Sequence, residues 1–375
     1  SFRLAKLLER GPFGSLLQIA GNTEHYSGPS KTSIESIFAK DMNLQLRRDN
    51  RSLTFIAKLN AEAEHPTLDV LSFEFGIRYD DINTEYHWDE ERRYYRQNET
   101  EPYRTDILSE DDWQDHFLLA KRLGLRLEGT INRLAYIAYF SLGNNNRLPT
   151  LQDEFYRQAT TLPVYHDTEL LKELVNTIDL GLDFSYQGRP GSPFTHIDGH
   201  LNFFDNAFVN KLSYKYSPGQ PPIPYNTLAA SISGVEVSGK FHFPAKRGSF
   251  ELGSIFLDLS NPLIFIGKPS YRHTIGLTLL RGNLTYNSNL WWDGRKVYLD
   301  DDGLYQEPKH NIDLSVDLAQ DWDHVSLTTT LAAKNILNFN ATQESMLINN
   351  QGYFITFYDT FQLLLNFRVA FHQGI

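Results

Sequence analysis

Cysteine is absent from the sequence, methionine occurs twice in 375 residues, and there is no run of lysine or arginine. Without cysteine, a disulfide framework and thiolate metal sites are excluded. A net charge of -11 without clustered cations makes nucleic acid an unexpected partner, because phosphate binding needs clustered lysine or arginine. No stretch approaches the roughly 18 consecutive apolar residues of a membrane helix, and the sequence from Ser1 onward does not open with a positively charged start followed by an apolar segment, the pattern of a signal peptide. Either the signal peptide was removed or the sequence is incomplete.

A mean hydropathy of -0.41 would ordinarily indicate a protein that avoids lipid. In a transmembrane β-barrel, however, only every second residue of a strand meets lipid, so the average hydropathy stays low while the alternation is strong. The chain is also rich in aromatic residues, with 25 Phe, 20 Tyr and 5 Trp, which favours strands. The pattern of alternation therefore decides the fold class.

Apolar and polar residues alternate over many segments. From Leu71 to Asp81 the sequence LSFEFGIRYDD puts large apolar side chains on one face and polar or small ones on the other. The same division recurs at 53–60, 122–128, 179–186, 312–318 and 362–371. Several segments sustain it for about 9–11 residues, the length that a tilted strand needs to cross a bilayer. The sequence thus predicts an all-β, antiparallel transmembrane barrel.

A soluble β-sandwich or β-propeller with one solvated face is the alternative, since its strands also alternate. Strands of soluble proteins are nearer 5–6 residues long, and the sequence shows no repeat of blade length. Both observations favour the transmembrane barrel.

Connections alternate between short and long, as expected for periplasmic turns and outer loops. Arg281–Asn283 and Ala319–Asp321 are predicted turns, whereas 81–112, 143–168, 212–228 and 294–310 are predicted long loops. On this division the chain contains about 14 strands, short of the roughly 22 of large outer-membrane transporters.

Several segments resemble those of a known family, in the same order. They are NRLPTLQDEFY from Asn146, ELLKELVNTIDLGLDFSY from Glu169, LNFFDNAFVNKL from Leu201, SGVEVSGKF from Ser233, GSFELGSIFLDLSNP from Gly248, KPSYRHTIGLTL from Lys268, VSLTTTLAAKNILN from Val325 and FQLLLNFRVAF from Phe361. Together they are similar to the barrel of TonB-dependent outer-membrane receptors. The resemblance extends from about Ser33 to Phe371 and is strongest after Asn146.

The resemblance implies that residues 1–375 are part of a 22-strand barrel in the outer membrane of a Gram-negative bacterium. It covers the barrel only, because neither the plug domain of the family nor its TonB box is recognisable. The implied partners are outer-membrane lipid and lipopolysaccharide, a small-molecule ligand such as a metal chelate, and the TonB complex acting through the missing plug domain. No cofactor is implied.

Charged residues on the polar face of the strands are expected to face the lumen, where they would hold a plug or line a water-filled pore. These residues are Glu74, Arg78, Arg126, Glu128, Asp179, Asp183, Asp313, Asp317 and Arg368. Aromatic residues near strand ends are candidates for the interfacial girdle or for ordinary packing, namely Trp291, Trp292, Tyr298, Tyr353 and Tyr358.

Aromatic residues in the predicted outer loops would stack on or enclose a ligand, although self-packing of the loops explains them equally simply. The candidates are Trp88, Tyr94, Tyr95, Tyr103, Trp113, Tyr156 and Tyr165. In the family the resemblance suggests, such loops and the plug apex capture the substrate.

Metal sites and enzyme chemistry have little support. Acidic groups at 89–91, 110–112 and 300–302 suit Ca²⁺ by oxygen type, but they lack EF-hand spacing, and solvated loops explain them better. His196 and His200 lie four apart in an alternating segment, which puts both on the polar face of a strand. No nucleophile elbow, Walker loop, paired-histidine zinc motif or GxGxxG element is present, so no enzyme is predicted.

Three functions compete. TonB-dependent uptake of an iron-siderophore, cobalamin, haem or glycan leads, a complete passive channel of about 14 strands is second, and a soluble all-β binding module is third. Sequence upstream of Ser1 would separate the first two, because the transporter requires a plug and further strands there. The third predicts partition into buffer without detergent.

Overall fold

The computed structural model consists of antiparallel strands and two short 3-10 turns. It describes residues 2–10, 13–35, 38–94, 101–102, 104–150, 153, 170–215, 223–262, 264–265, 268–294, 296–297, 305–306, 309–322, 325–338 and 361–371. The strands are β1 (Phe2–Arg10), β2 (Phe13–Glu35), β3 (Phe38–His65), β4 (Leu68–Tyr94), β5 (Arg104–Ile131), β6 (Leu134–Arg147), β7 (Glu173–Gln187), β8 (His196–Lys215), β9 (Ile223–His242), β10 (Gly248–Leu259), β11 (Tyr271–Arg281), β12 (Leu284–Asp293), β13 (Lys296–Val297), β14 (Tyr305–Gln306), β15 (Lys309–Trp322), β16 (Val325–Lys334) and β17 (Gln362–Phe371), with 3-10 turns at Pro244–Lys246 and Ile336–Asn338.

All but two of the strands form one 15-stranded sheet in which each strand pairs with its neighbours in sequence. The exceptions, β13 and β14, make a separate two-stranded hairpin between β12 and β15. Every pairing in the large sheet is antiparallel. The predicted all-β antiparallel fold is therefore confirmed, with 15 strands in the sheet where about 14 were expected.

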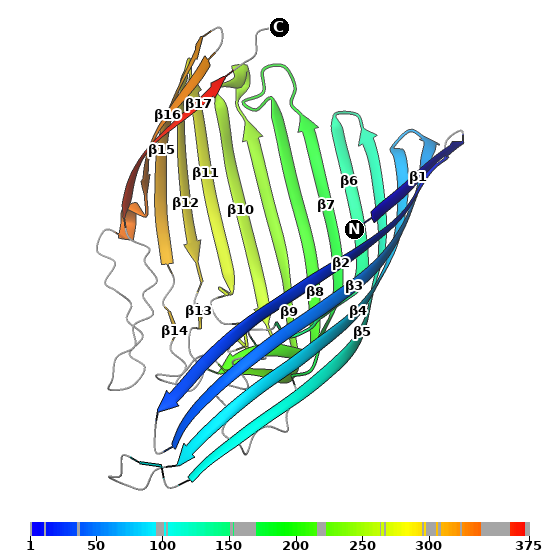
Figure 1. Cartoon of the computed structure of the whole chain (residues 1–375). Helices are drawn as coiled ribbons and strands as arrows, with labels where there is room; N and C mark the ends of the chain where they lie inside the picture. The colour runs from blue at the N-terminus through cyan, green and yellow to red at the C-terminus, as the bar shows by residue number, and fades with distance from the viewer. Residues whose placement is uncertain are drawn as a thin grey trace.

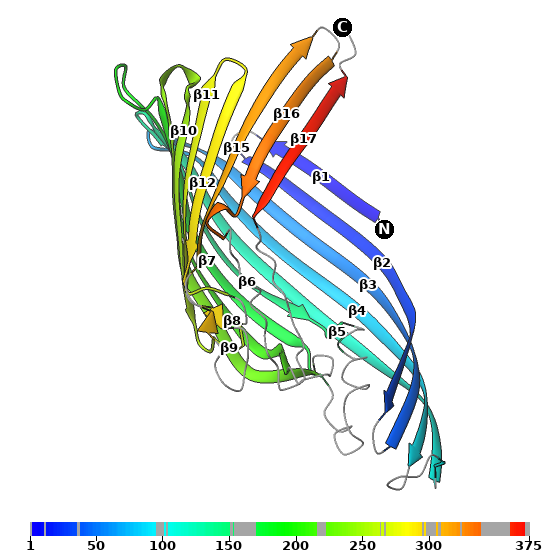
Figure 2. The same cartoon turned by 90° about the vertical axis from the view of Figure 1, so that its left-hand side faces the viewer.

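The sheet is strongly curved and open, with β1 and β17 as its two edges (Figures 1 and 2). Its concave side is called the inner face below, and its convex side the outer face. Neighbouring strands run in opposite directions, and β1 and β17 are the first and the last of the 15 strands in the sheet. The two edge strands therefore run in the same direction. The described strands therefore form a large arc of barrel wall.

The two ends of the sheet differ in their connections. At one end, short turns such as Gly282–Asn283 join β11 to β12, whereas at the other end longer connections such as 148–172 join β6 to β7. The turn at Arg281–Asn283 was predicted correctly. The turn predicted at Ala319–Asp321 was wrong, because β15 continues through these residues to Trp322 before the chain reverses.

The outer face is apolar across neighbouring strands. The register aligns Phe73 with Leu125, Leu125 with Phe140, and Phe140 with Leu180, and the row continues through Phe203 and Val235 to Phe256. Many of these side chains are exposed, among them Leu180 at 55% and Phe203 at 46%. The alternation in sequence therefore produces one continuous exposed apolar surface, as a lipid-facing wall requires.

Strands β2 to β5 are much longer than a bilayer crossing and project at the loop end, at the lower left of Figure 1. On the outer face of β3 and β4 the apolar residues stop at Leu53 and Tyr79, and polar residues such as Arg51 and Asp81 follow. The outer face of β5 keeps exposed apolar residues further along, at Phe117, Trp113 and Ile107. At about 3.3 Å per residue, the stretch from Asp81 to Tyr94 projects roughly 43 Å further.

The prediction of a long loop at 81–112 is therefore wrong. These residues belong largely to β4 and β5, which pair from Val70 opposite Glu128 as far as Tyr94 opposite Arg104. The sequence prediction missed these strands because it relies on alternation of apolar and polar residues. In this projecting part both faces are largely solvated, and the alternation is lost. No helix among the described residues is long and apolar enough to span a membrane.

Candidate functional site

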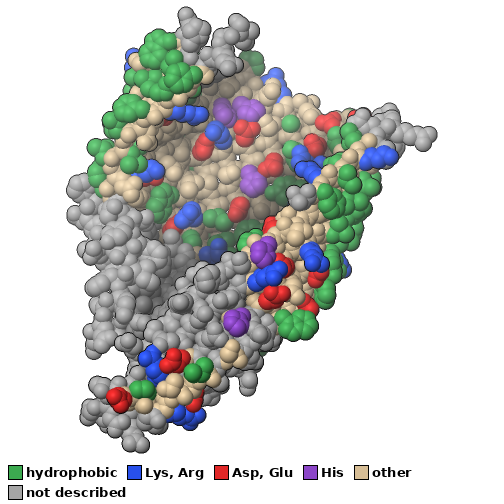
Figure 3. Space-filling view, viewed as in Figure 1, with side chains coloured by type: hydrophobic (Ala, Val, Ile, Leu, Met, Phe, Trp, Pro, Cys, Tyr) green, Lys and Arg blue, Asp and Glu red, His purple; other side chains and the backbone are tan. Residues whose placement is uncertain are grey.

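The inner face carries the charged side chains of the sheet. The register places all the residues predicted to face the lumen on this one face: Glu74, Arg78, Arg126, Glu128, Asp179, Asp183, Asp313, Asp317 and Arg368. Figure 3 looks into the hollow of the sheet, where acidic, basic and histidine side chains are visible among polar ones.

Several of these charges are paired on the wall. Arg78 donates to both carboxylate oxygens of Asp80, at 2.8–2.9 Å, and Arg126 contacts Glu128 at 2.8 Å. Asp317 accepts hydrogen bonds from Thr330 and from Asn287 of the neighbouring strands. The inner wall is thus a hydrogen-bonded polar surface, which suits contact with water or with another polar surface.

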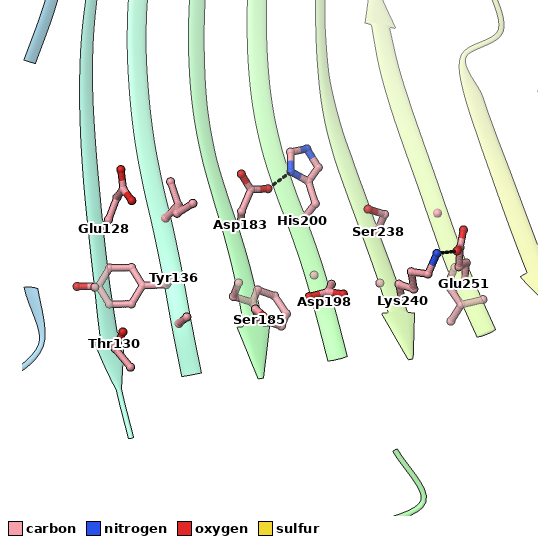
Figure 4. Close-up of a pocket in the computed structure, with 18 of the residues that line it drawn as sticks. Glu128, Thr130, Tyr136, Asp183, Ser185, Asp198, His200, Ser238, Lys240 and Glu251 are labelled. Atoms are coloured by element: carbon pink, nitrogen blue, oxygen red, sulfur yellow. Dashed lines mark hydrogen bonds and ion pairs between the residues drawn. The ribbon is translucent and has the colours of Figure 1, made fainter. Parts of the chain in front are cut away.

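A cavity of about 610 Å³ lies on the inner face near the short-turn end. Its wall runs across β4 to β11, and the side chains labelled in Figure 4 include Glu128, Asp183, Ser185, Asp198, His200, Ser238, Lys240 and Glu251. A second hollow of about 480 Å³ adjoins it and shares Ile137 and Asp183. Acidic side chains outnumber lysines in the first cavity, so it favours cationic or hydrogen-bond-donating groups.

Histidines and aspartates on three neighbouring strands form the most ordered part of this wall. His200 Nδ1 lies 2.6 Å from Asp183 Oδ1, and the two point towards each other from adjacent strands in Figure 4. Asp198 lies between two imidazoles, 2.7 Å from His196 Nε2 and 3.1 Å from His242 Nε2. The arrangement combines charge with hydrogen bonding, and Asp183, Asp198 and His200 line the cavity.

The cluster does not have the geometry of a metal centre. Within the part of the chain that the structure describes, no group of three or more His, Asp or Glu side chains is placed to hold a metal ion. Each histidine instead makes a hydrogen bond to a carboxylate, and the His196 and His242 rings lie 5.4 Å apart between centroids.

Sequence reasoning put His196 and His200 on the polar face, but it missed Asp198, Lys240 and His242 as their neighbours. Alternation shows which face a residue occupies, whereas cross-strand neighbours depend on register. Lys240, for example, forms an ion pair with Glu251 of β10. The polar positions within HIDGH and SGVEVSGKF were the only available signal.

The predicted ligand-binding aromatics divide into two groups. Trp88, Tyr94 and Trp113 lie in the projecting parts of β4 and β5, not in loops, and Trp113 is 68% exposed. Arg104 lies over the Tyr94 ring at 5.4 Å, so this aromatic contacts a neighbouring strand. Tyr95, Tyr103, Tyr156 and Tyr165 lie outside the described residues.

The girdle candidates Trp291 and Trp292 lie on opposite faces of β12. The Trp292 ring contacts the His273 ring in a tilted arrangement on the outer face, with 4.9 Å between centroids, whereas Trp291 is on the inner face, where Arg272 lies over its ring at 5.8 Å. Trp291 is therefore not part of an outer girdle. Tyr298, Tyr353 and Tyr358 lie outside the described residues.

Among solved structures, the copper transporter OprC is similar to the chain with a TM-score of 0.56 and 12% identity, over 95% of this chain and 56% of OprC. The ferric yersiniabactin uptake receptor FyuA from Yersinia pestis gives a TM-score of 0.46 and 11% identity, over 89% and 51% of the two chains. The chain thus spans about half the length of these proteins. At such identities the likeness to OprC concerns the fold alone.

No curated protein matches the chain in sequence. A family match, in contrast, extends over nearly the whole chain, from residue 12 to residue 373, and its description is "TonB dependent receptor-like, beta-barrel". It agrees with the antiparallel sheet, the apolar outer face and the charged inner face described above. The chain belongs to the TonB-dependent receptor β-barrel family.

Proposed function

We propose that this chain is the C-terminal part of an outer-membrane barrel through which a scarce nutrient is taken up by TonB-dependent transport. The observation that carries the proposal is the sheet itself, whose outer face is continuously apolar while its inner face is charged and hollowed. A bilayer and a polar lumen on opposite sides of one wall account for both faces. Family members are outer-membrane proteins of Gram-negative bacteria, which supports this location.

Strand direction favours completion by additional strands over the passive channel. If β1 and β17 paired directly, their common direction would make the closing pair parallel, whereas bacterial outer-membrane barrels are antiparallel with even strand numbers. Antiparallel closure needs an odd number of further strands, and a barrel of about 22 would supply about seven. A plug domain outside this chain would then couple it to the TonB complex.

The proposed substrate is one of the classes taken up by the family: an iron-siderophore, cobalamin, haem, another metal chelate or a glycan. Solved neighbours include a copper transporter and a ferric yersiniabactin receptor. The acidic balance of the inner cavity suits polar partners, and in the complete receptor the plug would occupy much of this wall. Outer-membrane lipid and lipopolysaccharide would cover the apolar outer face.

The test is to read the coding region upstream of Ser1, express the full-length protein in a strain that lacks it, and measure ligand uptake with and without TonB. We expect the protein in the outer-membrane fraction and uptake of at least one chelate only when TonB is present. Uptake that is independent of TonB, with a signal peptide directly before Ser1, would support the passive channel. Recovery in buffer without detergent would support a soluble module.

A further inference from the structure

At the loop end of the inner face, the chain that leaves β6 turns sideways onto neighbouring strands. Leu148 is 9% exposed and forms a buried cluster with Ile82 of β4 and Leu118 of β5. This cluster lies on the inner face at the edge of the outer apolar band, since Phe117 next to Leu118 and Asp81 next to Ile82 face outward. The first residues after β6 therefore cover the inner face of β4 and β5.

One end of this segment is fixed by Arg48 of β3. Its Nη1 donates to the carbonyl oxygen of Pro149 at 2.7 Å, and its Nε donates to the hydroxyl of Thr84 at 2.9 Å. Thr84 is completely buried. A guanidinium held at two points fixes a carbonyl more firmly than a single flexible donor, because less side-chain freedom is lost per hydrogen bond.

The other end is fixed by Tyr214 of β8. Asp153 is 3% exposed, and its carboxylate accepts the Thr150 amide at 2.8 Å and the Tyr214 hydroxyl at 2.7 Å. The Thr150 hydroxyl in turn accepts the Asp153 amide at 3.1 Å. A buried carboxylate whose oxygens are both hydrogen-bonded is costly to release, since opening would leave its partners unsatisfied.

We propose that Leu148, Pro149, Thr150 and Asp153 form a fixed strap, anchored by Arg48 and by Tyr214, that stays on the inner face throughout transport. The inference rests on the proposed function and adds to it a fixed element at the start of the β6–β7 connection. The strap is then a permanent part of the outer mouth, and its contacts with Arg48 and Tyr214 stay unbroken during ligand capture.

Hydrogen exchange tests the fixed position without reference to transport. The Thr150 and Asp153 amides are expected to exchange at least about tenfold more slowly than the amide of Gly191 in an exposed turn, because both amides donate hydrogen bonds that are partly buried beside the buried Asp153 carboxylate. The Y214F variant should speed exchange at Thr150 severalfold. The matched control Y286F removes an exposed hydroxyl on the outer face and should leave Thr150 unchanged.

Crosslinking tests the role in the cycle. The chain has no cysteine, so the I82C/L148C pair introduces a unique site in the chain that a short bismaleimide can lock. In the full-length receptor we expect uptake by the crosslinked protein within about twofold of the single-cysteine variants treated alike. Loss of uptake in a crosslinked protein that remains folded would overturn the proposal, as would wild-type exchange at Thr150 as fast as at Gly191.

The two failures are distinguishable. If the wild-type receptor takes up none of the chelates, the proposed function fails, but the exchange measurement still decides whether the strap is fixed. If uptake is normal and the strap exchanges rapidly, the strap proposal alone fails.

Discussion

The ring of Tyr139 on β6 lies directly over the α-carbon of Gly181 on the paired strand β7. A β-carbon built at Gly181 would be 2.0 Å from Cζ of that ring, far inside van der Waals contact. Glycine is therefore required here by close approach on the inner wall, and not by its backbone conformation.

Replacing this glycine tests the contact. G181A should displace the Tyr139 ring and lower the free energy of unfolding by about 1–3 kcal/mol, the usual cost of overpacking. The matched control is G124A, also on the inner face, whose β-carbon would meet its nearest neighbour at an ordinary 3.6 Å. Denaturant unfolding in lipid vesicles measures both. Equal stabilities for the two variants would contradict the prediction.

Asn311 organises the end of β16 and is completely buried. Its side chain donates to Asn335 and accepts the amide of Leu337 at 3.2 Å, and Asn335 has a left-handed φ of 57° that asparagine tolerates. N311A should cost about 1–3 kcal/mol of unfolding free energy, since it leaves these groups without their partner. N289A, at an exposed position on β12, should change it by less than about 0.5 kcal/mol.

Arg272 and Asp293 form a two-point ion pair between β11 and β12, with nitrogen to oxygen distances of 2.5 and 2.8 Å. Asp293 is completely buried, so R272A should destabilise the fold by about 3 kcal/mol because the carboxylate would lose its main charge partner. The double variant R272A/D293A should recover part of that loss. Strictly additive effects in the unfolding free energies would show that the pair is not coupled.

The Tyr214 phenol, which anchors the strap, is expected to make the free energy of unfolding depend on pH. Tyr214 lies on β8 beyond Val209, after which this strand continues with the polar residues Lys211 and Ser213. Burial together with the Asp153 hydrogen bond raises the pKa of its phenol to about 12. Because an unfolded tyrosine titrates near pH 10, its contribution to stability is complete below about pH 10 and is lost as the pH rises towards the folded pKa.

The stability difference between wild type and Y214F should therefore be constant below about pH 10 and shrink between about pH 10 and 12. Unfolding free energies of both proteins across this range measure it, and Y286F, which removes an exposed phenol, is the control. A difference that does not change with pH would mean that the Tyr214 phenol is not held in its neutral form.

The sequence predicted the face of nearly every strand residue correctly within the membrane-length segments. Between Leu71 and Tyr79, or between Leu363 and Phe371, alternation is imposed by having lipid on one side of the wall and a polar lumen on the other. It failed between residues 81 and 112, where both faces of β4 and β5 are solvated and the selection for alternation disappears. In this region β4 and β5 are strands because β4 pairs with β5 on one side and with β3 on the other, in long hairpins. The alternation along a single strand carries no information about that pairing.

The sequence by itself determined the fold class, the assignment of Glu74, Asp183 and their companions to one face, and the resemblance to the receptor family. Only the tertiary structure decided that His200 meets Asp183, that Asp198 joins two histidines, and that the segment after Arg147 turns inward onto Arg48 and Tyr214. The reason is physical: alternation has a period of two along one strand, whereas these contacts depend on register and curvature across many strands.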